Sequence, residues 1–102
     1  MICQETAFER AQVRIDIERE PGAVDDRFMA TMSVIDTNSH VLHPLVFSDG
    51  SRVAISGASE AFALSSALTY LESRFGGYSE TTFACVAPTM LSTVGMPVVV
   101  ER

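Results

Sequence analysis

"SRVAISGASEAFALSSALTYLESRFGG", residues 51–77, is the stretch of sequence that decides the fold. Its first part, residues 52–57, alternates apolar and polar side chains and predicts a strand. Ser59 then suits the N-cap of a helix, because its hydroxyl can accept a hydrogen bond from an amide of the first turn. The paired glycines at the far end suit the left-handed conformation that ends many helices. Residues 59–75 are therefore the predicted main helix.

The apolar residues of this predicted helix recur at helical spacing. They are Leu64, Leu68, Leu71 and Phe75, with Ala61 and Ala67 beside them. Side chains at intervals of three and four residues share one side of a helix, so this stripe is expected to pack on a sheet.

Three further strands are predicted upstream, at residues 10–20, 27–36 and 41–47. The first alternates strictly, which is typical of an antiparallel strand with one face buried and the other in water. The second has apolar side chains on both faces, which favours a central place in the sheet. Pro44 in the third suggests a sheet edge or a bulge. Asp49-Gly50 predicts a hairpin turn of type I′.

The order of elements is four strands, one helix and a strand-like tail at residues 78–102. This order predicts an α+β fold, a two-layer sandwich whose antiparallel sheet has about four or more strands, with one main helix. The whole chain, residues 1–102, is expected to form a single domain. The path of the tail stays open. Since one helix can cover only one face of such a sheet, we expect the chain to form a homodimer that hides the remaining apolar surface.

Composition and charge exclude some partners. Seven basic residues against thirteen acidic ones give a net charge of −6, and the pI is about 4.7. Such a chain repels nucleic-acid backbones and anionic membrane surfaces, so neither is an expected partner. The longest uncharged stretch, residues 81–100, is interrupted by Pro88 and Pro97, which argues against a membrane span. With no secretory signal at the N-terminus, a soluble cytoplasmic protein is the prediction.

The two cysteines, Cys3 and Cys85, are expected to be free thiols, and a single disulfide between them is the alternative. Cys85 lies in an apolar run with no cation or histidine beside it, which is typical of an unreactive buried thiol. Cys3 is expected to lie in a terminus that frays.

His40 and His43 are the only histidines, and with Asp36 and Asp49 nearby a metal site can be imagined. Residues three apart in an extended segment point to opposite faces, so the two rings would diverge unless the chain bends between them. Two histidines without a third ligand make a weak zinc pattern. Whether they converge on a site stays open, and no metal is predicted.

No residue is assigned a catalytic or cofactor-binding role. The serines around the helix, Ser59, Ser65 and Ser66, lack the glycine context of a nucleophile elbow. Three carboxylates, those of Asp16, Glu18 and Glu20, are expected on the outer face of their strand. They form either an acidic docking surface or a solvated face that discourages aggregation.

Residues 27–75 are similar to small bacterial domains of the HicB antitoxin type, in which a strand ending in glycine leads into a capped helix. Gly57, Ser59 and Ala63 fall near the pattern Gly-x-Thr-x-x-Glu-Ala, while Phe62 stands where the pattern has its acidic residue. Any strand-to-helix junction favours these features, so no family is assigned.

The function expected from these observations is that of a small, non-enzymatic protein-interaction module of the antitoxin, immunity or adaptor kind, acting as a homodimer. The alternative is a small-molecule binder or an enzyme whose pocket forms at a dimer interface.

Overall fold

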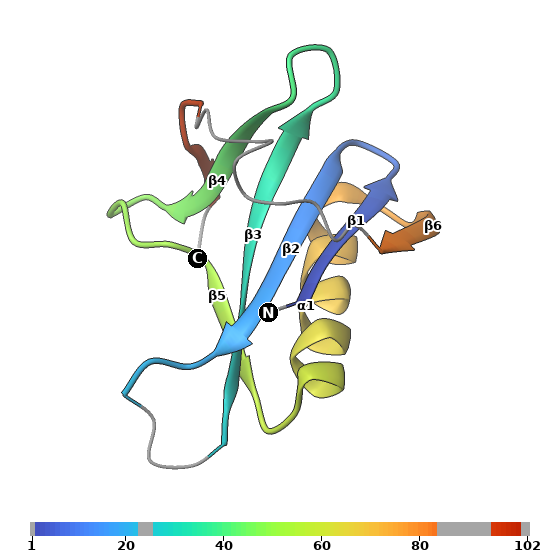
Figure 1. Ribbon diagram of the computed structural model, residues 1–102. Coiled ribbons are helices and arrows are strands. Elements are labelled where there is room, and N and C mark those ends of the chain that lie inside the picture. Colours follow the sequence, from blue (N-terminus) through green and yellow to red (C-terminus); the bar gives the residue numbers. More distant parts are fainter. Residues whose placement is uncertain (1, 23–25, 84–94, 101–102) are drawn as a thin grey trace.

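A computed structural model describes residues 2–22, 26–83 and 95–100, and within them the chain forms one seven-stranded sheet and one helix (Figure 1). The elements are β1 (Ile2–Phe8), β2 (Gln12–Arg19), β3 (Phe28–Asp36), β4 (Val41–Phe47), β5 (Ala54–Gly57), α1 (Glu60–Phe75), β6 (Tyr78–Phe83) and β7 (Val98–Val100). The strand order is β6-β1-β2-β3-β4-β7, and β5 pairs with β3. All pairs are antiparallel except β4 with β7. The predicted α+β fold is confirmed.

The alternating pattern of β2 gives the sheet its buried face. Val13, Ile15 and Ile17 are fully buried and pack with the helix side of the molecule. The prediction that the opposite face of β2 lies in water is wrong at Arg14, which is only 4 % exposed. The prediction of a central position for β3 is confirmed, because β3 pairs with β2 on one side and with β4 and β5 on the other.

Two strands share the second edge of β3. β4 pairs with residues 33–36 of β3, and β5 pairs with residues 28–31. Pro44 pairs with Ser33 at the end of the β3–β4 register, and the residues after it pair with β7 instead. Proline has no amide hydrogen to donate, so a strand readily leaves its neighbour there.

The turn at Asp49-Gly50 differs from the predicted type I′. Gly50 has a φ of +89°, but Asp49 does not have a positive φ. The amide of Gly50 donates to the Phe47 carbonyl at 2.8 Å, and the amide of Phe47 donates to the Ser51 carbonyl at 2.8 Å. This pattern is a three-residue loop with glycine in the left-handed position. The Asp49 carboxylate fixes the loop by accepting hydrogen bonds from the amide and hydroxyl of Ser51.

The N-terminal residues form a strand that sequence reasoning missed. β1 lies between β2 and β6, so Cys3 is buried and does not fray. The tail, which the sequence indicated only as strand-like over residues 78–102, contains two strands among its described residues, β6 and β7. Residues 84–94, including Cys85, lie outside the described part of the chain.

The helix agrees with its prediction at both ends. Ser59 is the N-cap, and its hydroxyl accepts a hydrogen bond from the amide of Phe62 at 3.1 Å. Gly76, with a φ of +88°, ends α1. The loop between β1 and β2 also covers this end, because Arg10 donates to the carbonyls of Arg74 and Phe75. With 16 residues, α1 is too short to cross a bilayer, and the described residues contain no helix that could do so.

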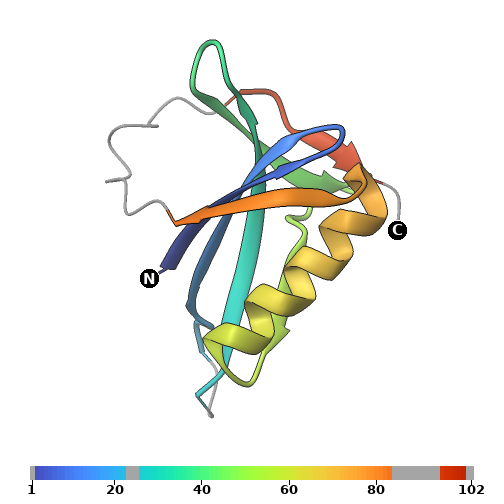
Figure 2. The same cartoon turned by 90° about the vertical axis from the view of Figure 1, so that its right-hand side faces the viewer.

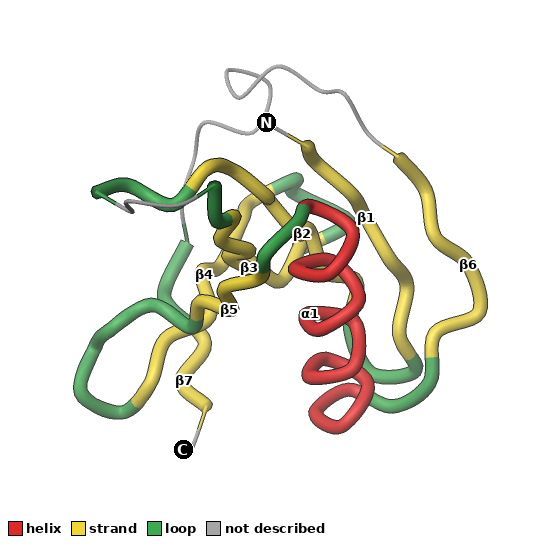
Figure 3. Tube along the Cα trace, turned by 90° about the horizontal axis from the view of Figure 1, so that it is seen from below, coloured by secondary structure: helices red, strands yellow, loops and turns green. Residues whose placement is uncertain are grey.

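The sheet curves around α1, which lies on its concave face (Figures 2 and 3). The helix packs on β2, β3 and β5 and reaches β1 only at its margin. Ala63, Ala67 and Leu71 are fully buried in this contact. The candidate site lies along the side of α1 that is nearest to β1 and β6.

Candidate functional site

Two adjoining cavities lie along the side of α1 that faces β1 and β6. One has a volume of about 440 Å³ and is lined by Ile2, Ile17, Ser59, Glu60, Ala61 and Leu64. The other has a volume of about 370 Å³ and is lined by Ala61, Leu64, Ser65, Leu68, Thr69, Glu72 and Tyr78. Because both share Ala61 and Leu64, they form one open depression, which we call the α1 groove.

The walls of the α1 groove are mostly apolar or small. Leu64 and Leu68 on the helix face Ile2 and Tyr78 on the strands across the groove, and Tyr78 is 41 % exposed. The charged residues of the lining are Glu60 in the first turn of α1 and Glu72 three turns later. The groove is thus lined by both apolar and polar side chains, with a carboxylate near each end.

Two polar side chains lie on the helix-facing side of β1, beside the groove. Gln4 and Thr6 pair with Ile15 and Val13 of β2, and cross-strand neighbours project to the same face of a sheet. Both polar residues are 1 % exposed. The Gln4 amide nitrogen donates to the Thr6 hydroxyl at 3.4 Å, and its Oε1 accepts no hydrogen bond from the described residues. An unsatisfied buried polar atom costs stability, so this pair weakens the packing of β1.

β6 is the outermost strand on this side of the sheet (Figures 1 and 3). It pairs with β1 along one edge, and no described residue pairs with its other edge. A six-residue strand with an unpaired row of amides and carbonyls is a template for another strand. The open edge of β6 borders the α1 groove through Tyr78.

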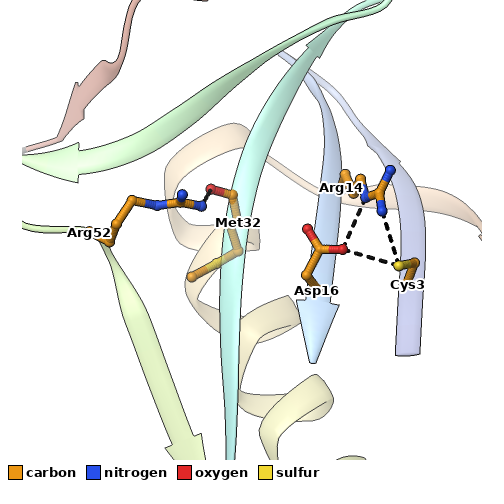
Figure 4. A network of polar contacts seen from close by, with 5 residues as sticks. All are labelled: Cys3, Arg14, Asp16, Met32 and Arg52. Carbon is orange, nitrogen blue, oxygen red and sulfur yellow. Dashed lines mark hydrogen bonds and ion pairs between the residues drawn. The ribbon is translucent and has the colours of Figure 1, made fainter. Parts of the chain in front are cut away.

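A cluster of polar side chains lies on the opposite face of the sheet (Figure 4). Arg14 donates from Nε to Asp16 Oδ1 at 3.0 Å and from its terminal nitrogen to Cys3 Sγ at 3.1 Å. The Cys3 thiol in turn donates to the same carboxylate oxygen at 3.1 Å. Arg52 lies farther along the sheet and donates to the carbonyl of Met32. Sequence reasoning missed this cluster because strand pairing, which it could not give, brings Cys3 beside Asp16.

The electrostatics of this cluster do not favour a reactive thiol. Burial raises the pKa of Cys3, and the hydrogen bond to Asp16 raises it further, outweighing the opposing effect of Arg14. Burial alone would lower the pKa of Arg14, but its hydrogen bond to Asp16 raises that pKa. The guanidinium stays charged and the thiol stays protonated at neutral pH. Because the thiolate is the nucleophile, the cluster is a structural one.

The two histidines do not gather a metal-ligand set. His40 lies in the turn after β3 with a φ of +60°, and its amide donates to the Asp36 carbonyl. His43 lies in β4, with Nδ1 3.0 Å from the carbonyl oxygen of Met96. The Asp36 carboxylate accepts from the amides of Asn38 and Ser39, and these hydrogen bonds lower its pKa. Across the described residues, no three His, Cys, Asp or Glu side chains lie close enough to hold a metal ion.

The three carboxylates singled out on β2 and in the loop that follows it do not form a free acidic face. Asp16 is paired with Arg14. Glu20 lies 3.5 Å from Arg27 and accepts a hydrogen bond from Ser56. Glu18 is exposed. Of the serines, Ser59 caps α1, while Ser65 lines the α1 groove.

Comparison with known proteins adds no family. The chain matches no protein-family profile, and no curated protein or solved structure is significantly similar to it. The resemblance to HicB-type domains is therefore not supported. The structural features that bear on function are the α1 groove and the edge of β6.

Proposed function

We propose that this chain is a small, non-enzymatic protein-interaction module of the adaptor, immunity or antitoxin kind that acts as a homodimer. The unpaired edge of β6 carries the proposal, because six residues of open strand offer main-chain hydrogen bonds to a second copy. The other end of the sheet, β7, has three residues and offers a shorter edge. The protonated, unpaired Cys3 thiol suits a reducing compartment, so we place the protein in the cytoplasm.

The symmetry of such a dimer follows from antiparallel pairing between the two β6 strands. Two β6 edges that pair antiparallel are related by a twofold axis perpendicular to the sheet. This axis keeps both α1 helices on one face, with the two α1 grooves side by side between them. The dimer then joins two seven-stranded sheets into one and leaves no β6 edge exposed.

The test is the mass of the particle in solution, measured by light scattering after size-exclusion chromatography. Neighbouring residues of a strand direct their amides to opposite edges, so Thr81→Pro and Thr82→Pro remove amides from different edges of β6. The wild type is expected to be a dimer at about 100 μM. One of the two variants is expected to be a folded monomer, and the other to lose stability because its pairing with β1 is broken.

The matched control lies at the opposite end of the sheet. Val99 in β7 is 61 % exposed, and Val99→Lys adds a charge there without touching β6. It is expected to leave the dimer intact. A monomeric wild type, or a dimer that only Val99→Lys dissociates, would contradict pairing through β6.

A second candidate function is supported by the size of the cavities. Volumes of about 370 and 440 Å³ fall in the range of small-molecule sites, and the proposed dimer would place two such cavities side by side. This alternative is a small-molecule binder, or an enzyme, whose pocket forms at the dimer interface. A thermal-shift screen of metabolites separates the two functions, because a ligand that fills the groove raises the unfolding temperature by mass action.

A further inference from the structure

We infer that Asn38, in the turn between β3 and β4, is a site of spontaneous deamidation in the folded protein. It is the one asparagine of the 102-residue chain, and a serine follows it. A small residue after an asparagine lets the next main-chain amide reach the asparagine side chain. The turn is the loop at the top of Figure 1. The modification is independent of the proposed dimer, because β1 and β2 separate β3 from β6 in the sheet.

The reaction consumes one water molecule and needs no other reactant. The amide nitrogen of Ser39 loses its proton and attacks Cγ of Asn38, the bond from Cγ to the side-chain nitrogen breaks, and ammonia leaves. The product is a five-membered succinimide ring, which water opens at either of its two carbonyl carbons. One opening gives aspartate, and the other gives isoaspartate, in which the main chain runs through the former side chain. Both products carry a carboxylate in place of the amide.

The turn leaves the reacting groups accessible. Residues 36–40 are all exposed, and within the described part of the chain the Asn38 side chain makes no hydrogen bond. The amide of Ser39, which is the nucleophile, donates to Asp36 Oδ1 at 3.4 Å, longer than the usual range for such a bond. A weakly held amide can turn toward the carbonyl carbon beside it. The negative charge of Asp36 opposes loss of the amide proton, so alkaline buffer is the condition for the test.

The loop after β4 holds a second pair of the same chemistry, Asp49-Gly50, in which the succinimide ring would form with loss of water. Here both reacting groups are held. The amide of Gly50 donates to the Phe47 carbonyl at 2.8 Å, and the Asp49 carboxylate accepts from the amide and hydroxyl of Ser51 at 2.9 and 2.6 Å. An ionised carboxylate is also a poorer electrophile than a neutral amide. Folding is therefore expected to protect Asp49 and to leave Asn38 reactive.

Deamidation changes the charge and the shape of the β3–β4 turn. It adds a carboxylate two residues from Asp36, in a chain whose net charge is −6. In the isoaspartate product the main chain is longer by one carbon, so the amides of residues 38 and 39 no longer meet the Asp36 carboxylate together. The β3–β4 pairing ends at Asp36 and Val41, and we expect this end of the hairpin to open. An enzyme that methylates isoaspartyl carboxylates is the class of partner that the product fits.

Mass spectrometry of the full chain, incubated for several weeks in mildly alkaline buffer, tests the inference. Trypsin cleaves after Arg27 and Arg52, so one peptide, residues 28–52, carries both pairs. We expect the folded protein to deamidate at Asn38 at a rate within a factor of a few of that in guanidinium. Isoaspartate at Asp49, located by fragmentation of the peptide, is expected to form in the unfolded chain only.

Two results would overturn the inference. One is a folded protein that stays unmodified at Asn38 over a period in which the unfolded chain deamidates. The other is isoaspartate at Asp49 that forms as fast in the folded protein as in the unfolded chain, since the two loops would then not differ in the way that their hydrogen bonds require.

Two variants test the assigned nucleophile. Ser39→Gly removes the side chain beside the attacking nitrogen and is expected to speed up the deamidation several-fold. Asn38→Gln is the matched control, because its longer side chain would have to close a less favourable six-membered ring, and its mass should stay unchanged. An unchanged rate in Ser39→Gly, or a gain in mass that persists in Asn38→Gln, would contradict attack by the Ser39 amide on Asn38.

Discussion

Gly57 shows how one missing side chain sets the angle between β5 and α1. A Cβ at this position would lie 2.7 Å from the amide nitrogen of Ala63, which is backbone and cannot swing away. We expect Gly57→Ala to lower the free energy of unfolding by about 1–3 kcal/mol, measured by urea denaturation. Gly77→Ala is the control, because its Cβ would meet only Glu9 Oε1 at an ordinary 3.8 Å. Equal denaturation midpoints for the two variants would contradict this account.

Gln4 is a polar residue in an apolar position. Its side chain is 1 % exposed, and its Oε1 has no hydrogen-bond partner. Gln4→Met keeps the length of the side chain and removes the unsatisfied atom, so we expect the free energy of unfolding to rise by about 1 kcal/mol. Thermal and urea unfolding measure this change. A loss of stability of similar size would mean that the amide has a partner in the folded protein.

The raised pKa of Cys3 makes stability depend on pH on the alkaline side. In the unfolded chain the thiol loses its proton near its ordinary pKa of 9.0, while in the folded protein it keeps the proton to higher pH. Above pH 9 the folded state therefore binds more protons than the unfolded state, and stability falls as pH rises. The stabilising contribution is complete below that pH.

This dependence is measured as the difference between the wild type and Cys3→Ala in urea unfolding from pH 7 to pH 10.5. The difference isolates the contribution of the Cys3 thiol to the pH dependence. We expect the stability of the wild type to fall more steeply than that of Cys3→Ala above pH 9. Parallel curves would show that the thiol titrates alike in both states.

At the scale of the element, the N-cap of α1 gives the clearest test of how one local hydrogen bond contributes to stability. Ser59 accepts from the Phe62 amide, which otherwise has no partner within the helix. We expect Ser59→Ala to cost about 1 kcal/mol of unfolding free energy. Ser65→Ala, in the exposed middle of α1, should be neutral or slightly stabilising, because alanine favours a helix. Similar losses in both variants would show that the cap is not the cause.

Elements with strong local patterns could be predicted from the sequence. β2 and α1 carry clear periods of two and of three to four residues, and the burial of β2 follows its period except at Arg14. β3 has apolar residues on both faces, and both faces contain buried residues. β1 was missed because Gln4 and Thr6 occupy buried positions of the core-facing row, where apolar residues are expected. The predicted turn type after β4 is wrong because the Asp49 carboxylate accepts hydrogen bonds from the amide and hydroxyl of Ser51, which favour a longer loop.

The candidate sites depend on contacts between distant residues, and no local pattern contains those. Cys3, Arg14 and Asp16 meet only through the register of β1 on β2. The α1 groove lies along one side of the helix, which packs mainly on β2, β3 and β5. The predicted stripe on α1 is only partly right: Ala67 and Leu71 are fully buried, but Ala61 is exposed and Ala63, outside that stripe, is fully buried. The local pattern does not give the position of the helix across the sheet, which decides this burial.

At the scale of the whole molecule, exposed apolar side chains lie near the rim of the sheet and on the outer side of α1. The face opposite α1 is lined in its centre by Arg14, Asp16 and Ser33. Among the described residues, the large apolar side chains that are most exposed are Phe62, Tyr78, Met96 and Val99. The surface that association would hide is therefore the margin of the molecule, and the open face of the sheet has less apolar area to bury than the sequence suggested.

A dimer that forms at this margin ties stability to concentration. We expect the midpoint temperature of unfolding to rise by several degrees between about 2 and 200 μM protein, because dilution favours the dissociated chain. Differential scanning fluorimetry measures the shift. The folded monomer among the β6 proline variants should show no such rise, and an identical midpoint for the wild type at both concentrations would contradict a dimer.

The pairing of β1 with β6 has a consequence for folding during synthesis. Thr6 of β1 pairs with Thr81 of β6, 75 residues later in the chain. During synthesis β1 can therefore pair with β2 early, but it can pair with β6 only after most of the chain has left the ribosome. Contacts between such remote segments slow folding. Throughout that interval one edge of β1 lacks its native partner, and an open strand edge is a template for pairing with other extended segments.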